Sequence, residues 1–362
     1  MPQINTRFWI FLFAVFGWFV VVQSVAIAQH SADESTIRIG FLVSEDPESD
    51  PLSREAMDAA QFAVDEINNE DGIDGKKVKL ITRISDGDWG ASSLKSVELI
   101  YDEEVHAIVS SLDGRDAHLV QMAIAKAHVI YLETRATDPT LSEANLPWFF
   151  RVTPSDRQQG QKLIGEIFDD RQISRIAIIH ADDYDERMAA NMFSRLLRDG
   201  GHPEAKTFSY DHRSPNFEEI TENLKSSDKQ GVLYFGKSTH LEGFMKTLKD
   251  TKIDLPVFTP LAILQTNNNP ENVTFVCPEF VLQKDESSFK ESFKQRFGYD
   301  PGIIGAYSYD GVRVMLEAIK LGGTETESLQ KELSGITFPG GITGQIEFDE
   351  NGDLIDNTTI CY

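Results

Sequence analysis

After residue 35, short apolar runs rich in β-branched residues alternate with amphipathic segments of helical length. Runs at 37–43, 77–84, 108–111 and 129–132 have the composition of strands, whereas 54–68 places Ala, Val and Ile residues at helical spacing. This alternation is typical of parallel sheets covered by helices. The sequence therefore predicts an α/β fold.

The same pattern begins again near residue 150, with a Thr-Pro-Ser-Asp helix start at 153–156. We expect strands at 175–180, 206–210, 231–236, 256–260 and 273–278, and helices at 184–198, 217–225 and 240–249. Two more helices are expected at 288–297 and 303–321, followed by a hairpin that turns at Asn351-Gly352. Since 362 residues are many for one core, the restart indicates two domains.

The first 28 residues have a different character. Arg7 precedes an apolar run at 8–22, and Ala26-Ile27-Ala28 forms a small-x-small site. This pattern predicts a signal peptide at 1–28 and export of the mature chain, with an uncleaved membrane anchor as the alternative. The formal net charge of −24 argues against nucleic acid and anionic membrane surfaces as partners.

Polar loops follow two neighbouring strands of the first domain. Asp113, Gly114 and Arg115 follow the run at 108–111, and Arg135 and Thr137 follow the next run. Open α/β sheets bind small ligands at the carboxyl ends of their strands. Acidic residues are favoured at helix starts without any ligand, but cations are not, so the two arginines are the stronger candidates, with a surface ion pair as the alternative.

Several familiar motifs are present only in part. The segment GVLYFGKS at 231–238 has the spacing of a P-loop, but its interval is an apolar strand; Lys237 and Ser238 remain candidates because they end that strand. DENGD at 349–353 begins like a calcium loop, yet Leu354 stands where Gly is required. Because HExxH and GxSxG are both missing, we predict no metal, no cofactor and no enzymatic activity.

A series of segments resembles, in order and spacing, the amino-acid-binding proteins of branched-chain ABC transporters, which are type I periplasmic binding proteins. They are DAAQFAVDEINNEDGIDGKKVKL, ATDPTLS, FFRVTPSDRQQG, RIAIIHADDYDERMA, YSYDGVRVMLEAI and TGQIEFDENGDL. The resemblance implies two Rossmann-like lobes joined by three crossovers, with a small solute held between them and delivered to a membrane permease. The alternative is a ligand-sensing subunit of the same fold that transports nothing.

On this resemblance, lobe 1 comprises 36–150 and 280–336, and lobe 2 comprises 151–279 and 337–362. The crossovers are expected near 149–153, 277–282 and 337–341. Cys277 and Cys361 would then lie in or beside hinge strands. Export permits a disulfide between them, while two free thiols remain the alternative.

The polar loops and the resemblance together predict a monomeric protein whose two lobes contact the solute through one set of residues: Asp113, Gly114, Arg115, Arg135, Ala136, Thr137, Tyr184, Lys237, Ser238 and Leu261. The resemblance implies that the loops of lobe 1 bind a ligand carboxylate with backbone amides and hydroxyls. It also implies that Tyr184 closes over the ligand from lobe 2.

Two of these residues depart from the family pattern. Gly114 stands where the family usually has a hydroxyl, and Leu261 stands where it has the acid that pairs with a ligand ammonium. An unpaired ammonium would be unfavourable in a closed cleft. Either Asp113, Asp182 or Asp183 replaces that acid, or the solute is a related amide or carboxylate without an ammonium group.

Overall fold

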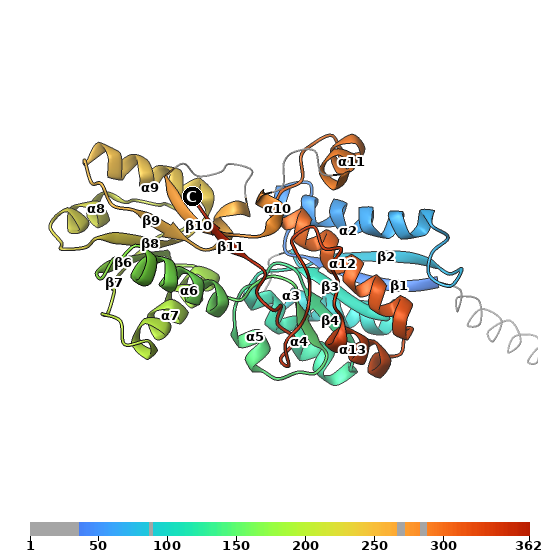
Figure 1. Ribbon diagram of the computed structural model, residues 1–362. Helices are drawn as coiled ribbons and strands as arrows, with labels where there is room; N and C mark the ends of the chain where they lie inside the picture. Colours follow the sequence, from blue (N-terminus) through green and yellow to red (C-terminus); the bar gives the residue numbers. More distant parts are fainter. Residues whose placement is uncertain (1–35, 87–89, 266–271, 283–287) are drawn as a thin grey trace, which may run out of the picture.

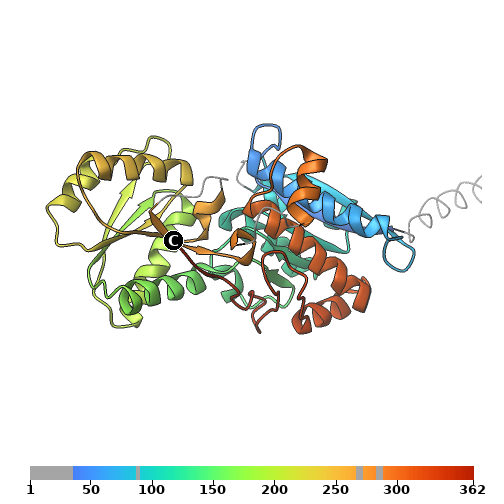
Figure 2. The same ribbon diagram turned by 45° about the horizontal axis from the view of Figure 1, so that its top comes forward.

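The computed structural model describes residues 36–86, 90–265, 272–282 and 288–362. Two sheets covered by helices form two lobes that lie next to each other (Figures 1 and 2). The expected two-lobed α/β fold is therefore confirmed. The expected signal peptide at 1–28 lies outside the described residues. Within the described ranges, no helix is both long and apolar enough to cross a membrane.

Lobe 1 contains a parallel sheet in the order β2-β1-β3-β4-β5. Its strands are β1 (Thr36–Val43), β2 (Lys77–Ile84), β3 (Ala107–Ser111), β4 (Ile130–Glu133) and β5 (Phe149–Arg151). The helices α2 (Pro51–Asn69) and α12 (Ile303–Gly322) cover one face, while α3 (Ala91–Val97) and α4 (Gly114–Ala127) cover the other. Because strand side chains alternate, Phe41 packs toward the first helix pair and Leu42 toward the second.

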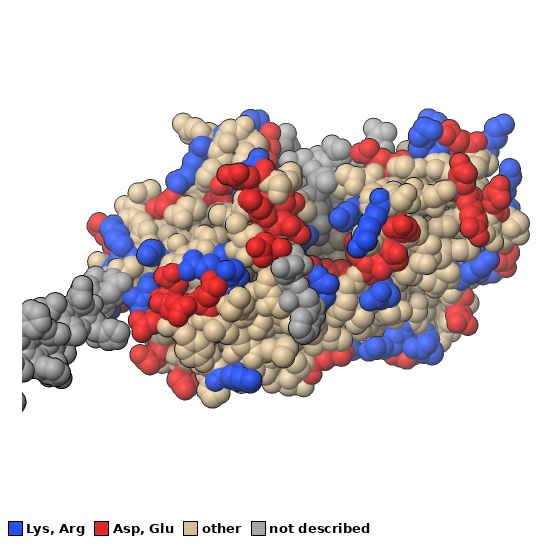
Figure 3. All heavy atoms as spheres, turned by 180° about the vertical axis from the view of Figure 1, so that it is seen from behind, with Lys and Arg blue, Asp and Glu red and all other residues tan. Residues whose placement is uncertain are grey.

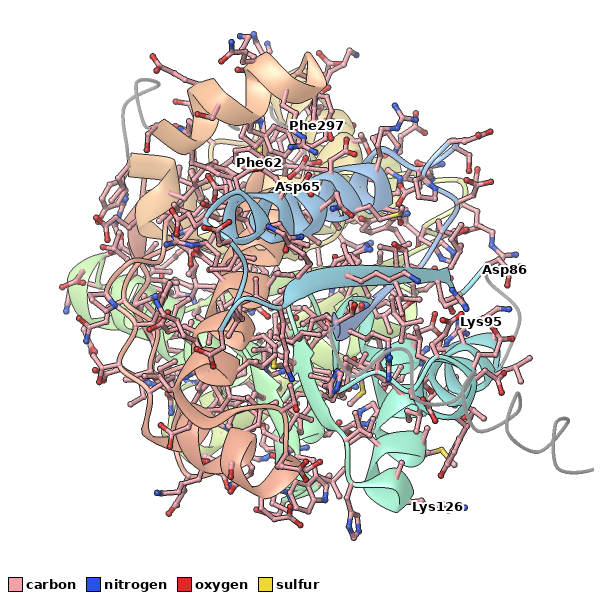
Figure 4. The ribbon with its side chains drawn as sticks, turned by 90° about the vertical axis from the view of Figure 1, so that its right-hand side faces the viewer. Phe62, Asp65, Asp86, Lys95, Lys126 and Phe297 are labelled. Atoms are coloured by element: carbon pink, nitrogen blue, oxygen red, sulfur yellow. A yellow bond between two sulfur atoms is a disulfide. The ribbon has the colours of Figure 1, made fainter. Side chains whose placement is uncertain are left out.

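Shorter elements complete lobe 1. They are η1 (Glu98–Asp102), α5 (Thr140–Glu143), α10 (Glu279–Leu282), α11 (Ser288–Phe297) and α13 (Thr326–Gly335). Figure 4 shows Phe62 of α2 close to Phe297 of α11, and their ring centroids are 6.3 Å apart at nearly right angles. Arg296 of α11 also pairs with Asp65 of α2. Aromatic packing and an ion pair thus attach α11 to this lobe.

Lobe 2 contains a sheet in the order β11-β10-β9-β8-β6-β7, in which β11 alone is antiparallel to its neighbour. Its strands are β6 (Ile176–Ala181), β7 (Lys206–Tyr210), β8 (Gly231–Phe235), β9 (Val257–Thr259), β10 (Val273–Cys277) and β11 (Thr359–Cys361). One face packs against α6 (Asp156–Ile164), η2 (Gly165–Asp170) and α7 (Tyr184–Asp199). The other packs against α8 (Glu218–Lys225), α9 (Ser238–Asp250) and η3 (Leu261–Gln265). As expected, the interval of the P-loop-like segment is a buried strand, β8.

The third crossover differs from the expected position at 337–341. Phe348 packs against Phe150 of lobe 1, with ring centroids 5.1 Å apart, and Thr343 donates its backbone N–H to Asp310 of α12 at 2.8 Å. Residues 337–354, expected in lobe 2, thus belong to lobe 1. The chain crosses between Leu354 and Thr359, because burial of the apolar residues in this segment holds it on the first lobe.

The expected hairpin near Asn351-Gly352 is present in a reduced form. Two antiparallel bridges, Phe338 with Ile346 and Phe348 with Leu354, replace continuous strands. Gly352 has a φ of 80°, and a Cβ there would lie 2.1 Å from the carbonyl oxygen of Phe149. Glycine is therefore required where this turn meets β5.

A disulfide joins Cys277 of β10 to Cys361 of β11, with Cα atoms 6.0 Å apart. Of the two alternatives open from the sequence, the structure contains the bridge. It connects the C-terminal strand to the strand that leads into the second crossover.

Candidate functional site

The lobes meet where α4 of lobe 1 and α7 of lobe 2 begin. The backbone N–H of Gly114 donates to both carboxylate oxygens of Asp185, at 3.0 and 3.3 Å. The Tyr184 hydroxyl donates to Asp138 Oδ2 at 3.0 Å. These four residues define the lobe junction, and they bring the expected Gly114 and Tyr184 together. From behind, the surface between the lobes is hollowed, with acidic and basic side chains around the hollow (Figure 3).

The start of α4 is organised by Asp113. Its carboxylate accepts the backbone N–H of Asp116 at 2.8 Å and so caps the helix. Helix capping is the alternative to ligand contact that the sequence left open for this acid. Arg115 is exposed on the first turn of the helix. Of these loop residues, Gly114 is the one that reaches the other lobe.

The loop after β4 is organised by the buried carboxylate of Glu133. Its Oε1 accepts four backbone N–H groups, from Leu112, Thr134, Arg135 and Ala136, at 2.8 to 3.2 Å. Burial raises the pKa of Glu133, opposed by hydrogen bonds that include one from Ser110. The amide of Ala136, expected at the solute, thus donates to the protein's own acid, and solute contact by Ala136 stays a prediction.

Thr137 lies between the lobes and contacts the protein itself. Its carbonyl accepts the backbone N–H of Asp156 at 2.8 Å, and its side chain acts to lower the pKa of the Asp156 carboxyl group, against the larger effect of burial. Asp156 begins α6 of lobe 2, so this contact crosses from one lobe to the other. Burial raises the pKa of Asp156 to about 7, and the nearby Asp138 adds to this effect.

Asp138 was not among the expected site residues, although it directly follows Thr137. Besides Tyr184, its carboxylate contacts His118 Nε2 at 3.2 Å and the Thr140 hydroxyl at 2.7 Å. Burial alone would raise its pKa, but these hydrogen bonds outweigh burial and lower the pKa to about 2. Asp138 is therefore a fixed negative charge at the lobe junction.

The acidic run at 182–186 separates into different roles. Asp182 is exposed and pairs with His212, and Asp183 caps α7 by accepting the N–H of Glu186. The Asp185 side chain reaches lobe 1, where its carboxylate accepts the backbone N–H of Gly114. Burial raises the pKa of Asp185 well above its usual range, with Asp113 adding to the shift and Arg135 opposing it. Sequence reasoning missed Asp185 because such runs are ordinary at helix starts.

The remaining expected residues lie on other elements of lobe 2. Lys237 is exposed at the start of α9, after β8, which neighbours β6 in the sheet. Ser238 is the buried first residue of that helix. Leu261 is buried at the start of η3, and its N–H donates to Gln159 Oε1 at 2.8 Å. Solute contact by these three residues stays a prediction.

One further cluster lies on the surface of lobe 2. Potential ligand atoms of Asp182, Asp211 and His212 lie within 4.8 Å of one another. His212 Nδ1 is 2.6 Å from Asp182 Oδ1, so a hydrogen bond already accounts for this arrangement.

The sequence matches a known protein family over most of its length. Residues 36–360 match the model of a family described as periplasmic binding protein. The chain belongs to this family. The sequence is 21% identical over 351 residues to the leucine-, isoleucine-, valine-, threonine- and alanine-binding protein of Pseudomonas aeruginosa, with 93% of this chain and 92% of that protein covered. The resemblance to branched-chain amino-acid-binding proteins is thereby confirmed.

Other relatives are matched over a smaller share of their length. Glutamate receptor 3.1 of Oryza sativa is 23% identical over an alignment that is 407 residues long with its gaps and that covers 95% of this chain and 42% of the receptor. The Leu/Ile/Val-binding protein BraC3 of Rhizobium johnstonii is 26% identical over 189 residues, which cover 52% of this chain and 51% of that protein. The matches thus span less than two thirds of these two relatives.

Solved structures show the same fold. The substrate-binding protein LivJ of Streptococcus pneumoniae, in complex with isoleucine, has a TM-score of 0.76 at 19% identity, covering 90% of this chain and 95% of that one. A solute-binding protein of Rhodopseudomonas palustris, in complex with 3,4-dihydroxybenzoic acid, has a TM-score of 0.77 at 20% identity, covering 90% and 93%. At these identities the likeness establishes the fold alone.

Proposed function

We propose that this chain is the periplasmic solute-binding component of an ABC importer, which holds a small polar solute between its lobes and delivers it to a membrane permease. The observation that carries the proposal is the convergence of Gly114 and Asp138 of lobe 1 with Tyr184 and Asp185 of lobe 2. Relatives in the family are substrate-binding proteins, which supports binding without catalysis.

Closure of the lobes is the proposed response to the solute. A solute that contacts both lobes binds the closed arrangement more tightly, and this difference in affinity shifts the population toward closure. Three crossovers between the lobes act as the hinge. The permease then recognises the closed form of a monomer. The solute is an amino acid or a related amide or carboxylate.

A thermal-shift screen tests the binding function. Amino acids, amides, urea-like compounds and carboxylates are added separately to the purified chain. Since a ligand that binds only the folded state stabilises it by about 2.7 kcal/mol at 100 times its Kd, the true solute should raise the midpoint clearly. Failure of every class to shift the midpoint would contradict the proposal.

Arg135→Ala locates the binding position. Arg135 lies in the loop that follows β4 and leads to Asp138, and its charge opposes the rise in the pKa of Asp185. The variant should lose the shift given by the best solute while the midpoint without solute stays nearly unchanged. Arg175→Ala, an exposed arginine of lobe 2 that pairs with Asp228, is the matched control and should retain the shift.

A ligand-sensing subunit of a receptor or regulatory system is the second candidate. Similarity to a plant glutamate receptor over 95% of this chain supports it. Uptake of the labelled solute by cells with and without the gene separates the two candidates. Loss of uptake in the deletion strain supports transport, whereas unchanged uptake with a lost response to the solute supports sensing.

A further inference from the structure

The donors that the family resemblance assigns to a ligand carboxylate are paired with carboxyl groups of the protein itself. The Gly114 amide donates to Asp185, and the Ala136 amide donates to Glu133. The Tyr184 hydroxyl, expected to cover the ligand, donates to Asp138. Each of these three donors therefore has an internal acidic partner.

The contact between Gly114 and Asp185 shows how closely the chain is fitted to this arrangement. A Cβ on Gly114 would lie 2.7 Å from Asp185 Oδ1 and 3.1 Å from Asp138 Cβ. The hydroxyl residue that the family usually has at this position would occupy the space taken by the Asp185 carboxylate. The absence of a side chain at Gly114 therefore leaves the space in which the Asp185 carboxylate of lobe 2 reaches the Gly114 amide of lobe 1.

Asp185 also lies between two helix N-termini, a position that favours an anion. It is the second residue of α7, and its carboxylate lies against the first amide of α4. The N-termini of both helices carry partial positive charge toward it. A solute carboxylate at the same amide would first have to displace the Asp185 carboxyl group, which accepts that N–H at 3.0 Å and fills the space beside Gly114.

Most of the charged groups that act on Asp185 are themselves acids, among them Asp113 and Asp156. Asp113 adds to the raised pKa of Asp185, and Asp138, which accepts the Tyr184 hydroxyl at 3.0 Å, also lies next to Gly114. Arg135 is the cation that acts on Asp185. Carboxyl oxygens accept hydrogen bonds, so this junction complements a solute that donates them.

We infer that the solute of this protein is an amine or amide without a free carboxylate, because Asp185 supplies the carboxylate that binds the Gly114 amide. The inference rests on the proposed function and narrows its solute class. Solute N–H groups then meet the acids of the junction, in place of an α-carboxylate meeting backbone amides. The absence of the family acid at Leu261 is compensated by Asp185 and Asp138.

Matched pairs of compounds that differ only at the carboxylate test this inference. Leucine is compared with leucinamide, arginine with agmatine, and ornithine with putrescine, by calorimetry on the full chain. In the wild type, the member without a carboxylate should bind at least about tenfold more tightly in the pair that binds best. Asp185→Ala frees the Gly114 amide, so the preference should reverse toward the acid.

Asp185→Asn keeps the shape of the side chain but removes its charge, so its preference should lie between those of the wild type and Asp185→Ala. Asp199→Asn removes the same charge from the exposed far end of α7 and should retain the wild-type preference. Circular dichroism confirms that each variant is folded.

The outcomes separate the inference from the proposed function. Tighter binding of the acid by the wild type, with an unchanged ratio in Asp185→Ala, overturns the inference and leaves solute binding intact. Binding of neither member of any pair, together with no response in the wider thermal-shift screen, overturns the proposed function as well.

Discussion

The Arg151 guanidinium is fully buried and pairs with the carboxylate of Asp353, 202 residues further along the chain. Its Nε and Nη2 lie 3.0 and 2.5 Å from Asp353 Oδ1, and its Nη1 donates to the Asp138 carbonyl at 2.7 Å. Arg151 ends β5, just before the first crossover. One side chain thus connects the C-terminal hairpin, the first crossover and the loop that carries Asp138.

Replacing Arg151 with Met should destabilise lobe 1 severely. The variant leaves the Asp353 carboxylate without its partner in a mostly buried position, and breaking such a pair lowers the free energy of unfolding by about 3 to 5 kcal/mol. Urea denaturation followed by circular dichroism measures this change. Arg157→Ala, which breaks an exposed pair with Glu143, should change stability by less than about 1 kcal/mol. Equal effects of the two variants would contradict the assigned role of Arg151.

Loss of the disulfide should also be measurable. The bond between Cys277 and Cys361 closes a loop with a sequence separation of 84, and such bonds stabilise proteins by about 2 to 4 kcal/mol, chiefly by restricting the unfolded chain. A reductant should therefore lower the melting temperature of the wild type. It should have no effect on the Cys277→Ser/Cys361→Ser double variant, which should already melt at the lower temperature. A reductant effect on that variant would place the sensitivity elsewhere.

Stability should fall between pH 4.5 and 7 through Glu55. This buried residue of α2 accepts the backbone N–H groups of Gly302 and Gly305, yet burial outweighs them and raises its pKa from 4.5 to about 7. The folded state therefore holds this proton more tightly than the unfolded state. The resulting stability is complete below pH 4.5 and is lost as the pH rises through 7.

Glu55→Gln should remove that pH dependence. The Gln carbonyl still accepts the two N–H groups but carries no charge, so above pH 8 the variant should exceed the wild type by about 3 kcal/mol, and below pH 4.5 the two should agree. Denaturation midpoints across this pH range measure the difference. Glu48→Gln, at an exposed position, should give a curve parallel to that of the wild type. A parallel curve for Glu55→Gln would refute the assignment.

Sequence patterns predicted the fold well where periodicity and burial agree. The runs at 231–236 and 273–278 became strands β8 and β10 because their residues are buried on both faces of a parallel sheet. The third crossover was misplaced for the opposite reason. The segment 337–354 has little regular periodicity, and its location depends on distant partners such as Phe150 and Asp310.

The candidate site was predicted only in part. The family resemblance placed Gly114 and Tyr184 on opposite sides of a cleft, and both lie at the junction between the lobes, while their contact with a solute stays a prediction. Asp138 and Asp185 were missed, because an acid in a polar loop and an acid at a helix start have ordinary explanations. Their role depends on a contact between lobes, and one sequence carries no direct signal for such a pair.

Gly114→Ala should disturb the junction while leaving both lobes folded. The added Cβ would lie 2.7 Å from Asp185 Oδ1 and 3.1 Å from Asp138 Cβ, closer than such atoms pack, so either Asp185 or α7 must move away. We expect a loss of about 1 to 3 kcal/mol in the free energy of unfolding, as for other overpacked sites. Small-angle scattering should show a larger radius of gyration if the lobes separate. Gly165→Ala is the matched control, because a Cβ there meets nothing within 4 Å on a helix and should be neutral or slightly stabilising. If Gly114→Ala were as stable and compact as this control, Asp185 would not be held at Gly114 in solution.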